Sequence, residues 1–311
     1  MNSLDVERRE RLRAERQSVR PYRGRMEWRI IATFLAFSGA WVTVLVLGTN
    51  GTIPLWLAFL LNTVVASMFY MPLHEAVHGN IWGDETRARW AEDLIGIACS
   101  VPLAGTSYSS HRTIHMRHHA YTNDPTRDPD HFADGTLLEL IPKVIAFTVF
   151  GIFLPVFAFV PPTRRLLPAQ MRQSMSINDD ELQHAGRQQA RFWLAIHVTL
   201  LAAFVLGLGW EALFIWYLPA RVAAMWLAFI FAWFPHHPAD RIGRYVDTRV
   251  AVFPGVRWLA RGHEYHAVHH LFPRVPHYRL RPLWVEIGED MVSKGVRCEG
   301  RAPYATGPIV W

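Results

Sequence analysis

Residues 54–78 read PLWLAFLLNTVVASMFYMPLHEAVH, an apolar stretch that leads directly into two histidines four residues apart. The uncharged part, residues 54–73, has about the length that a helix needs to cross the hydrocarbon core of a bilayer. A similar stretch at residues 30–49 precedes it, and a short Gly/Asn/Pro turn separates the two. The sequence therefore predicts a membrane hairpin that returns the chain, at His74, to the side of the membrane where it started.

The composition of the 311 residues supports apolar spans with basic flanks. The chain is 51% hydrophobic with a net charge of +6, which excludes a disordered, collagen-like or coiled-coil protein. Most of the positive excess lies in residues 1–29, which hold nine arginines and five acidic residues. Basic residues just before a span favour a cytosolic N-terminus over a nucleic-acid-binding arm. The two cysteines, Cys99 and Cys298, exclude a disulfide scaffold and a cysteine-based metal site.

The number of later crossings follows from the need to keep all clustered histidines on one side of the membrane. Three further apolar candidates are residues 144–163, 192–210 and 212–235. All three lie between the second histidine cluster and the third, and an odd number of crossings would divide a single site. We therefore take residues 144–163, which contain Pro155 and end in two prolines, as a re-entrant or interfacial segment.

The predicted fold is an all-α integral membrane protein. It has four transmembrane helices in two hairpins and a cytosolic helical cap that carries three histidine boxes, with both termini in the cytosol. We expect it in a bacterial inner membrane, with the active site on the cytosolic side. The expected parts are a basic cytosolic segment at residues 1–29, a membrane domain at residues 30–285 and a C-terminal tail at residues 286–311.

Ten of the 16 histidines lie in three short windows with helical spacing. The windows are residues 74–78 (HEAVH), 111–119 (HRTIHMRHH) and 263–270 (HEYHAVHH). Positions three or four apart share one face of a helix, so HxxxH presents two imidazoles and HxxHH presents three. Eight such imidazoles are too many for one tetrahedral zinc and suit two metal ions, which ligand type alone allows to be Fe, Cu, Zn or Ni. A lone HxxxH is usually an ordinary surface helix, but three boxes beside predicted spans argue against that alternative.

The boxes and the residues after them resemble the integral-membrane fatty acid desaturase family, which includes carotenoid ketolases and one class of carotenoid hydroxylases. The matching stretches are HEAVH (74–78), HMRHHAYTNDPTRDPD (115–130) and YHAVHHLFPRVPHYRL (265–280). Together with the two-hairpin topology, the resemblance covers about residues 30–285. It implies a di-iron centre without haem, O₂ as co-substrate and an external electron donor for desaturating or hydroxylating a lipid chain.

The resemblance also implies which residues bind the metals. The box ligands are His74, His78, His115, His118, His119, His266, His269 and His270. A ninth ligand in such proteins often follows the fourth span. The stretch FPHHP (234–238) resembles the carotenoid-modifying branch there, and we take His236 rather than His237. We expect His111 not to ligate, because the family more often has an aromatic residue at that place.

Polar residues after the second box are expected to support the ligands. Ligating imidazoles usually donate their second N–H to a carboxylate or carbonyl, which fixes the tautomer. The candidates are Asn123, Asp124, Asp128 and Asp130. An Asp-Pro turn that caps the next element explains the same residues and is compatible with that role. We expect His263 and His277 to be supporting or surface groups.

Three functions remain open from the sequence. The first is a fatty acyl or acyl-lipid desaturase, and the second is a β-carotene hydroxylase or ketolase with the same metals. The third, a membrane metal-binding or transport protein, needs polar residues along a path inside the spans, where we find Arg221 and His197. No haem or iron–sulfur segment is recognisable in the 311 residues, so an enzyme of this kind needs a separate donor such as ferredoxin with its reductase. Basic cytosolic loops suit an acidic donor, and we expect a lipid substrate and no nucleic acid.

Overall fold

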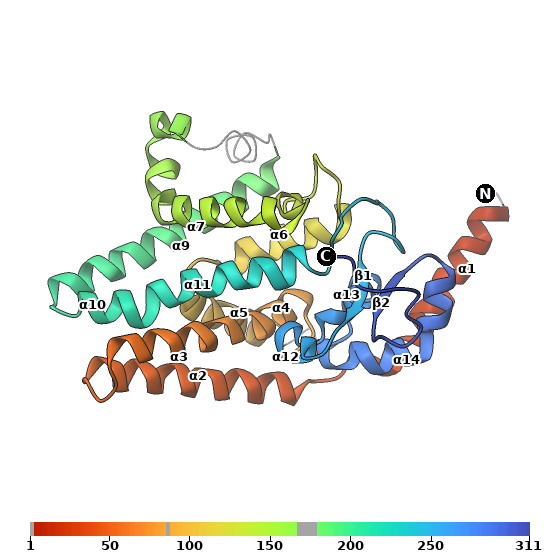
Figure 1. The fold of residues 1–311 in the computed structure, drawn as a ribbon, viewed down its shortest axis with the longest axis horizontal. Helices are drawn as coiled ribbons and strands as arrows, with labels where there is room; N and C mark the ends of the chain where they lie inside the picture. Colours follow the sequence, from red (N-terminus) through yellow and green to blue (C-terminus); the bar gives the residue numbers. More distant parts are fainter. Residues whose placement is uncertain (1–2, 85–87, 167–178) are drawn as a thin grey trace.

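The computed structural model describes residues 3–84, 88–166 and 179–311, and these are mostly helical (Figure 1). The α-helices are α1 (Ser3–Ser18), α2 (Trp28–Thr49), α3 (Leu55–Met68), α4 (Tyr70–His78), α5 (Arg89–Leu103), α6 (Tyr108–Tyr121), α7 (Leu137–Phe159), α9 (Asp180–Val205), α10 (Gly209–Glu211), α11 (Leu218–Leu227), α12 (Val256–Ala260), α13 (His266–Leu271) and α14 (His277–Ser293). The 3-10 segments are η1 (Arg20–Tyr22), η3 (His131–Ala133), η4 (Pro161–Leu166) and η7 (His263–Tyr265), and the π-helical segments are η5 (Ala212–Tyr217) and η6 (Ala228–Trp233). Two short strands complete the described chain: β1 (Arg249–Val252) and β2 (Arg297–Gly300).

Three stretches of the described chain are long and apolar enough to cross a membrane. They are Trp28–Thr49, Leu55–His78 and Gly209–Trp233. The first two are the expected hairpin, in which Gly51 takes a positive φ of 76° in the turn between the helices. The third joins α10, η5, α11 and η6 and corresponds to the expected span at 212–235.

The fourth expected crossing stays a prediction. Residues 192–210 fall in α9, in the turn that follows it and in the first two residues of α10, and α9 is not among the three candidate spans. The stretch at 144–163 lies in α7 and the start of η4, and α7 packs on α9 and α11. That this stretch does not cross is likewise still a prediction.

Figure 1 shows how the helices are arranged. The long helices α2, α3, α9 and α11 extend together toward one end of the molecule, and α1, α12–α14 and both strands lie at the other end. The α3 helix packs on α2 and α11, and α6 packs on α9. The site described below lies where these two parts meet, on α4, α6 and α13.

Local sequence explains why the first box sits at a helix end. Pro54 precedes α3 in an extended conformation, a common start for a helix. The helix α4 ends at His78 because Gly79 takes a left-handed conformation, with φ of 70°, where other residues are strained. His74 and His78 therefore lie on the last turns of α4, one helical turn apart and both buried.

The C-terminal part packs on α13 and adds a small parallel sheet to an otherwise helical fold. Strand β1 pairs with β2, with Arg249 opposite Arg297. Cys298 on β2 belongs to a core cluster with Leu280 and Trp284 of α14. The boundary expected after residue 285 falls within α14.

Candidate metal centre

A first group of four buried histidines comes from three helices. His74 and His78 end α4, His115 lies on α6 and His269 lies on α13. One ring nitrogen of each histidine lies within 4.8 Å of those of the other three. The i, i+4 spacing of the first box points both of its imidazoles into this group, as expected from the helical period.

A second group shares two of these helices. It consists of His118 on α6, His236 just after η6, and His266 and His270 on α13, and its ring nitrogens also lie within 4.8 Å of one another. His118 is one helical turn after His115 on α6. Each of the helices α6 and α13 thus contributes to both groups.

His119 lies between the two groups. Its Nε2 atom is 3.1 Å from Nε2 of His115 and 3.0 Å from Nε2 of His269. Its ring stacks on that of His270, with centroids 4.2 Å apart. All nine histidines predicted as ligands are therefore assembled in one place, and His119 contacts members of both groups.

The structure separates the two histidines of the FPHHP stretch. His236 joins the second group, whereas His237 donates from Nδ1 to the carbonyl of Gly135 at 3.1 Å. The backbone before His236 is held by Arg249, whose Nη2 atom donates to the carbonyl of Phe234 at 2.7 Å. Arg249 is 1% exposed, and its Nη1 atom is 2.8 Å from Oε2 of Glu299 on β2. The second strand therefore helps to fix the position of His236.

The chemistry of these side chains fits a metal centre. The Nε2 atoms of His118, His236, His266 and His270 follow one another at 3.2, 2.9 and 3.0 Å. Burial lowers the pKa of His236, His266 and His270 well below the usual value, so these rings are neutral and carry one N–H each. Two imidazole nitrogens bound to one ion at a right angle, with bonds of about 2.1 Å, lie about 3 Å apart. The distances between the Nε2 atoms therefore fit a metal ion bound by their lone pairs. Imidazole ligands suit Fe, Cu, Zn or Ni.

His74 gives a second, independent indication. Both of its ring nitrogens are buried and have no hydrogen-bond partner among the described residues. Leaving a buried polar group unpaired is costly, so such atoms need an explanation. An ion held by the first group would bind one of these two nitrogens.

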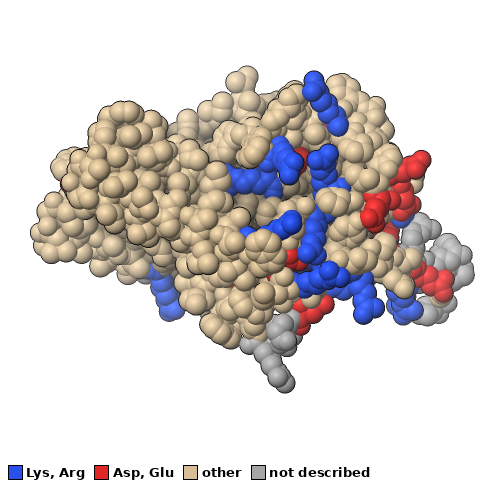
Figure 2. Space-filling view, turned by 90° about the horizontal axis from the view of Figure 1, so that it is seen from below, with Lys and Arg blue, Asp and Glu red and all other residues tan. Residues whose placement is uncertain are grey.

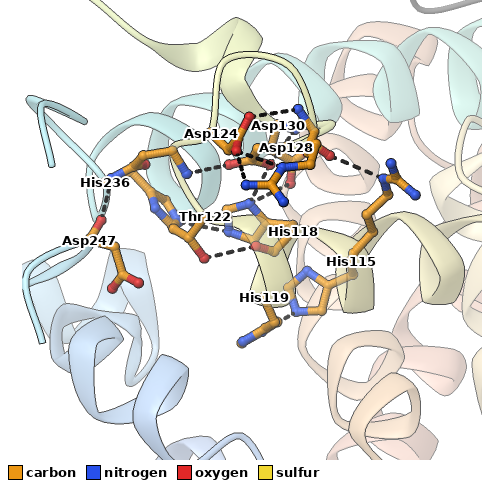
Figure 3. Close-up of polar contacts among 12 residues, drawn as sticks. His115, His118, His119, Thr122, Asp124, Asp128, Asp130, His236 and Asp247 are labelled. Atoms are coloured by element: carbon orange, nitrogen blue, oxygen red, sulfur yellow. Dashed lines mark hydrogen bonds and ion pairs between the residues drawn. The ribbon is translucent and has the colours of Figure 1, made fainter. Parts of the chain in front are cut away.

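Asp128 orients His118 through a buried hydrogen bond, visible in Figure 3. Nδ1 of His118 donates to Oδ1 of Asp128 at 2.8 Å, and Oδ2 of the same carboxylate accepts from the backbone N–H of Asn123 at 2.8 Å. Asp130 is farther away, with Oδ2 3.9 Å from the same ring nitrogen. The carboxylate of Asp128 thus fixes the tautomer and leaves Nε2 of His118 as a lone pair facing the second group.

The other two residues expected to support the ligands stabilise backbone segments instead. Asn123 donates from Nδ2 to the carbonyls of Arg241 and Asp247, at 2.8 and 2.7 Å. Asp124 accepts from Thr126 and Arg127 and makes no hydrogen bond to a histidine among the described residues. Asp124 therefore has the turn-capping role that we expected as the alternative, and Asn123 fixes the segment that leads from His236 to β1.

Sequence reasoning missed a second carboxylate next to the boxes. Glu75 lies inside the first box, is 1% exposed, and accepts from both the backbone N–H and Nδ1 of His277, at 2.9 and 2.8 Å. Its other oxygen accepts from Asn80 at 2.7 Å. The two partners in the first contact are 202 residues apart, so no local pattern could have joined them. Glu75 ties the end of α4 to the start of α14.

His263 is also more central than expected. It is 1% exposed, and its ring centroid lies 4.7 Å from that of His74 and 5.0 Å from that of His266. Neither ring nitrogen has a hydrogen-bond partner among the described residues. The sequence signal was its place three residues before His266, which continues the helical spacing of the third box.

A cavity of about 210 Å³ opens beside the histidines. Tyr70, Leu227 and Phe231 give it apolar and aromatic walls, and His115 and His266 give it one member of each histidine group. The π-helical turn η6 contributes Phe231, whose ring packs edge-on against His263 at 4.8 Å. An apolar ligand in this cavity would lie next to both groups.

The class that these features define is a membrane-associated helical protein with a metal-compatible centre, in which His74, His78 and His236 lie at or just after the ends of candidate spans and a cavity with apolar walls lies beside the histidines. The chain belongs to the fatty acid desaturase family, whose model (Fatty acid desaturase) matches residues 50–301.

Curated relatives are similar to this chain at low identity. A temperature-sensitive sn-2 acyl-lipid omega-3 desaturase (ferredoxin), chloroplastic, of Arabidopsis thaliana is 24% identical over 252 residues, which are 76% of this chain and 56% of the relative. An omega-3 fatty acid desaturase, chloroplastic, of Brassica napus is 24% identical over 274 residues, 82% of this chain and 65% of the relative. The chain thus spans between about half and two thirds of the length of these relatives.

Proposed function

We propose that this protein is an O₂-dependent oxidoreductase with a di-iron centre that desaturates a lipid chain. The observation that carries the proposal is the convergence of nine histidines, from α4, α6, α13 and the segment after η6, beside an apolar cavity. Family membership supports the same conclusion. The printed name of the Arabidopsis relative specifies an acyl-lipid substrate and ferredoxin.

Each histidine group is proposed to hold one ion. The first ion is assigned to His74, His78, His115 and His269, and the second to His118, His236, His266 and His270. His119, which contacts both groups, is the ninth ligand. When bound, two irons supply the O₂ chemistry that oxidises an unactivated C–H bond.

The overall reaction balances with one external two-electron supply. A –CH₂–CH₂– segment loses two hydrogens, and O₂ takes up these two hydrogens, two electrons and two protons to give a double bond and two waters. We propose that a ferredoxin-like protein with its reductase delivers the electrons. Arginines in the cytosolic loops are the proposed docking surface, because charge complementarity speeds such encounters.

The chain itself contributes positioning and a dry environment. Leu227 and Phe231 line the cavity and would hold the lipid chain of the substrate by apolar contact, with its reacting carbons next to His115 and His266. Placement within about 1 Å decides which carbon reacts, because small errors in position cost large factors in rate. Asp128 and Thr122 keep His118 and His270 oriented, through contacts of 2.8 and 3.2 Å to their Nδ1 atoms.

The test is product analysis by mass spectrometry in a bacterial host that supplies both fatty acids and carotenes. A new double bond in an acyl chain, dependent on O₂ and a reductant, is the expected result. Purified protein should contain two irons per chain. Active protein without a transition metal would refute the metal assignment, and reductant-driven O₂ consumption in the presence of lipid excludes a metal-transport function.

A second candidate function is hydroxylation or ketolation of a carotenoid. It is favoured by His236, because the FPHHP stretch that resembles the carotenoid-modifying branch supplies a member of the second group. The same host separates the two functions, because a carotenoid product shifts pigment absorption and mass while leaving the fatty acids unchanged.

The proposed location is the inner membrane of a bacterium, with the histidines and both termini on the cytosolic side. The three candidate spans support membrane association, and the arginines before α2 support the orientation. Cysteine labelling of single-cysteine variants in right-side-out and inverted vesicles tests this orientation.

A further inference from the structure

A second cavity lies where the N-terminal segment enters α2 and meets the start of α14. It has a volume of about 420 Å³ and is lined by Arg25, Glu27, Trp28, Arg29, Tyr278 and Arg279, among others. It shares no lining residue with the cavity beside the histidines. Its walls come from residues just before and at the start of α2 and from the first turn of α14.

The cavity has an excess of positive charge. Three arginines face one acid, Glu27, which is buried and pairs with Arg279 at 3.0 Å. Arg25 and Arg29 are exposed, and within the described chain neither has an ion-pair partner. The guanidinium of Arg29 lies over the ring of Tyr278, 5.4 Å from its centroid, which holds this charge at the cavity wall. Two cations are therefore available to an anion.

The cavity also lies at the expected boundary of the membrane. Trp28 is the first residue of a candidate span and is 63% exposed, and the neighbouring Met26 is 55% exposed. Trp and Tyr are enriched at the level of lipid headgroups, where one side of the ring is apolar and the other is wet. Figure 2 shows Lys and Arg side chains gathered between an uncharged half of this face and a half that carries the acidic side chains.

We propose that this cavity binds the phosphate of an anionic phospholipid from the surrounding membrane. Arg25 and Arg29 supply the charge, and Trp28 and Met26 contact the glycerol and the first acyl carbons. Guanidinium groups bind phosphate oxygens through paired, charge-assisted hydrogen bonds, and each arginine near an anionic membrane surface adds to the attraction. The site is separate from the metal centre, so it does not depend on the proposed function.

The experiment measures lipid binding to the purified full-length chain in neutral detergent by native mass spectrometry. The probes are dioctanoyl phosphatidylglycerol, dioctanoylglycerol with the same chains but no phosphate, and inorganic phosphate. We expect phosphatidylglycerol to bind and dioctanoylglycerol to bind at least tenfold more weakly. The double variant Arg25→Gln/Arg29→Gln should weaken phosphatidylglycerol binding about tenfold or more.

The matched control removes two charges elsewhere. Arg187→Gln/Arg191→Gln changes two exposed arginines of α9 and should leave phosphatidylglycerol binding unchanged. The melting temperature in the same detergent checks folding, and Arg25→Gln alone provides a milder variant with a smaller loss. Equal binding of dioctanoylglycerol, equal loss in the control, or inorganic phosphate binding as tightly as the lipid would each overturn the proposal.

Discussion

The Nδ1 atom of His118 lies 2.8 Å from Oδ1 of Asp128, and both side chains are nearly inaccessible to solvent, at 4% and 2%. Burial alone lowers the pKa of His118, but the hydrogen bond that His118 donates to Asp128 and the charges of Asp130 and Asp128 outweigh it, and the net shift is upward. Its neighbours in the second group, His236 and His266, are shifted downward. The carboxylate therefore makes His118 the most basic ring of its group, and a more basic imidazole is a stronger metal ligand.

Replacing Asp128 tests this coupling. Asp128→Asn removes the charge while keeping a side chain of the same shape, and we expect iron affinity or turnover to fall about 10- to 100-fold. Iron content after dialysis and the rate of lipid oxidation measure the effect. Asp124→Asn is the matched control, since Asp124 contacts Thr126 and Arg127 rather than a histidine. Equal iron loss in both variants would contradict an orienting role for Asp128.

The assignment of ions to groups predicts how single histidine variants behave. His78→Ala removes a member of the first group and His270→Ala a member of the second. Each should abolish turnover and reduce iron from two ions to about one per chain, with normal membrane insertion. His184→Ala, at an exposed position of α9, should leave iron content and turnover unchanged. A pair of box variants with an unaltered product profile would refute the ligand set.

Filling the cavity beside the histidines should alter the reaction without removing metal. Ala228 lines the cavity near Phe231, and Ala228→Leu adds three carbons to a space of about 210 Å³. We expect turnover to fall tenfold or more, or the position of oxidation to move along the chain, because the reacting carbon is displaced. Mass spectrometry of the products, with iron analysis of the same sample, measures both. Unchanged rate and regiochemistry would show that the substrate lies elsewhere.

Acid should release the N-terminal helix. Glu15 on α1 accepts from Tyr245 at 2.6 Å, Lys294 at 3.0 Å and Arg244 at 3.1 Å. Burial raises the pKa of Glu15, but these hydrogen bonds lower it more, so its pKa lies below the usual value for a glutamate. A depressed pKa means that this stabilisation is complete above about pH 4.5 and is lost as pH falls through the lower folded-state value.

Hydrogen exchange of residues 3–18 measures this release. We expect exchange, after correction for intrinsic rates, to increase as the pH falls through the depressed pKa of Glu15. We also expect increased exchange at pH 7 in Glu15→Gln, since charged hydrogen bonds contribute roughly 1.5–3 kcal/mol. Glu10→Gln, at an exposed position of the same helix, should behave as the wild type. A pH-independent pattern in the wild type would contradict the role of Glu15.

The spans and the boxes were predictable because each follows from a short-range rule. Lipid requires about 20 apolar residues in a helix, and the helical period brings HxxxH and HxxHH together, so α2, the α3–α4 pair and the box histidines were found from the sequence. The preference for His236 over His237 rested on the resemblance, and the structure brings His236 into the second group.

What the sequence left open depends on contacts between distant residues. The division of His115, His118 and His119 between two groups follows from how α6 faces α4 and α13, which spacing within one box does not determine. The contact of Glu75 with His277 and the β1–β2 pairing join segments too far apart for any periodic pattern. Asp124 accepts from Thr126 and Arg127 of its own turn, whereas Asp128, four residues later, reaches His118; the sequence pattern does not distinguish these two aspartates.

The contact between Arg249 and Glu299 bears on what the C-terminal residues contribute. All nine candidate ligands lie in the chain up to residue 270. The residues that hold Arg249 come later: Glu299 on β2, and Val310, whose carbonyl accepts from Arg249 at 2.6 Å. A polypeptide that ended after the third box would carry every candidate ligand but lack Glu299 and Val310, the two partners that hold Arg249 against the Phe234 carbonyl. Loss of residues 297–310 should therefore weaken the positioning of His236 even though every box histidine remains.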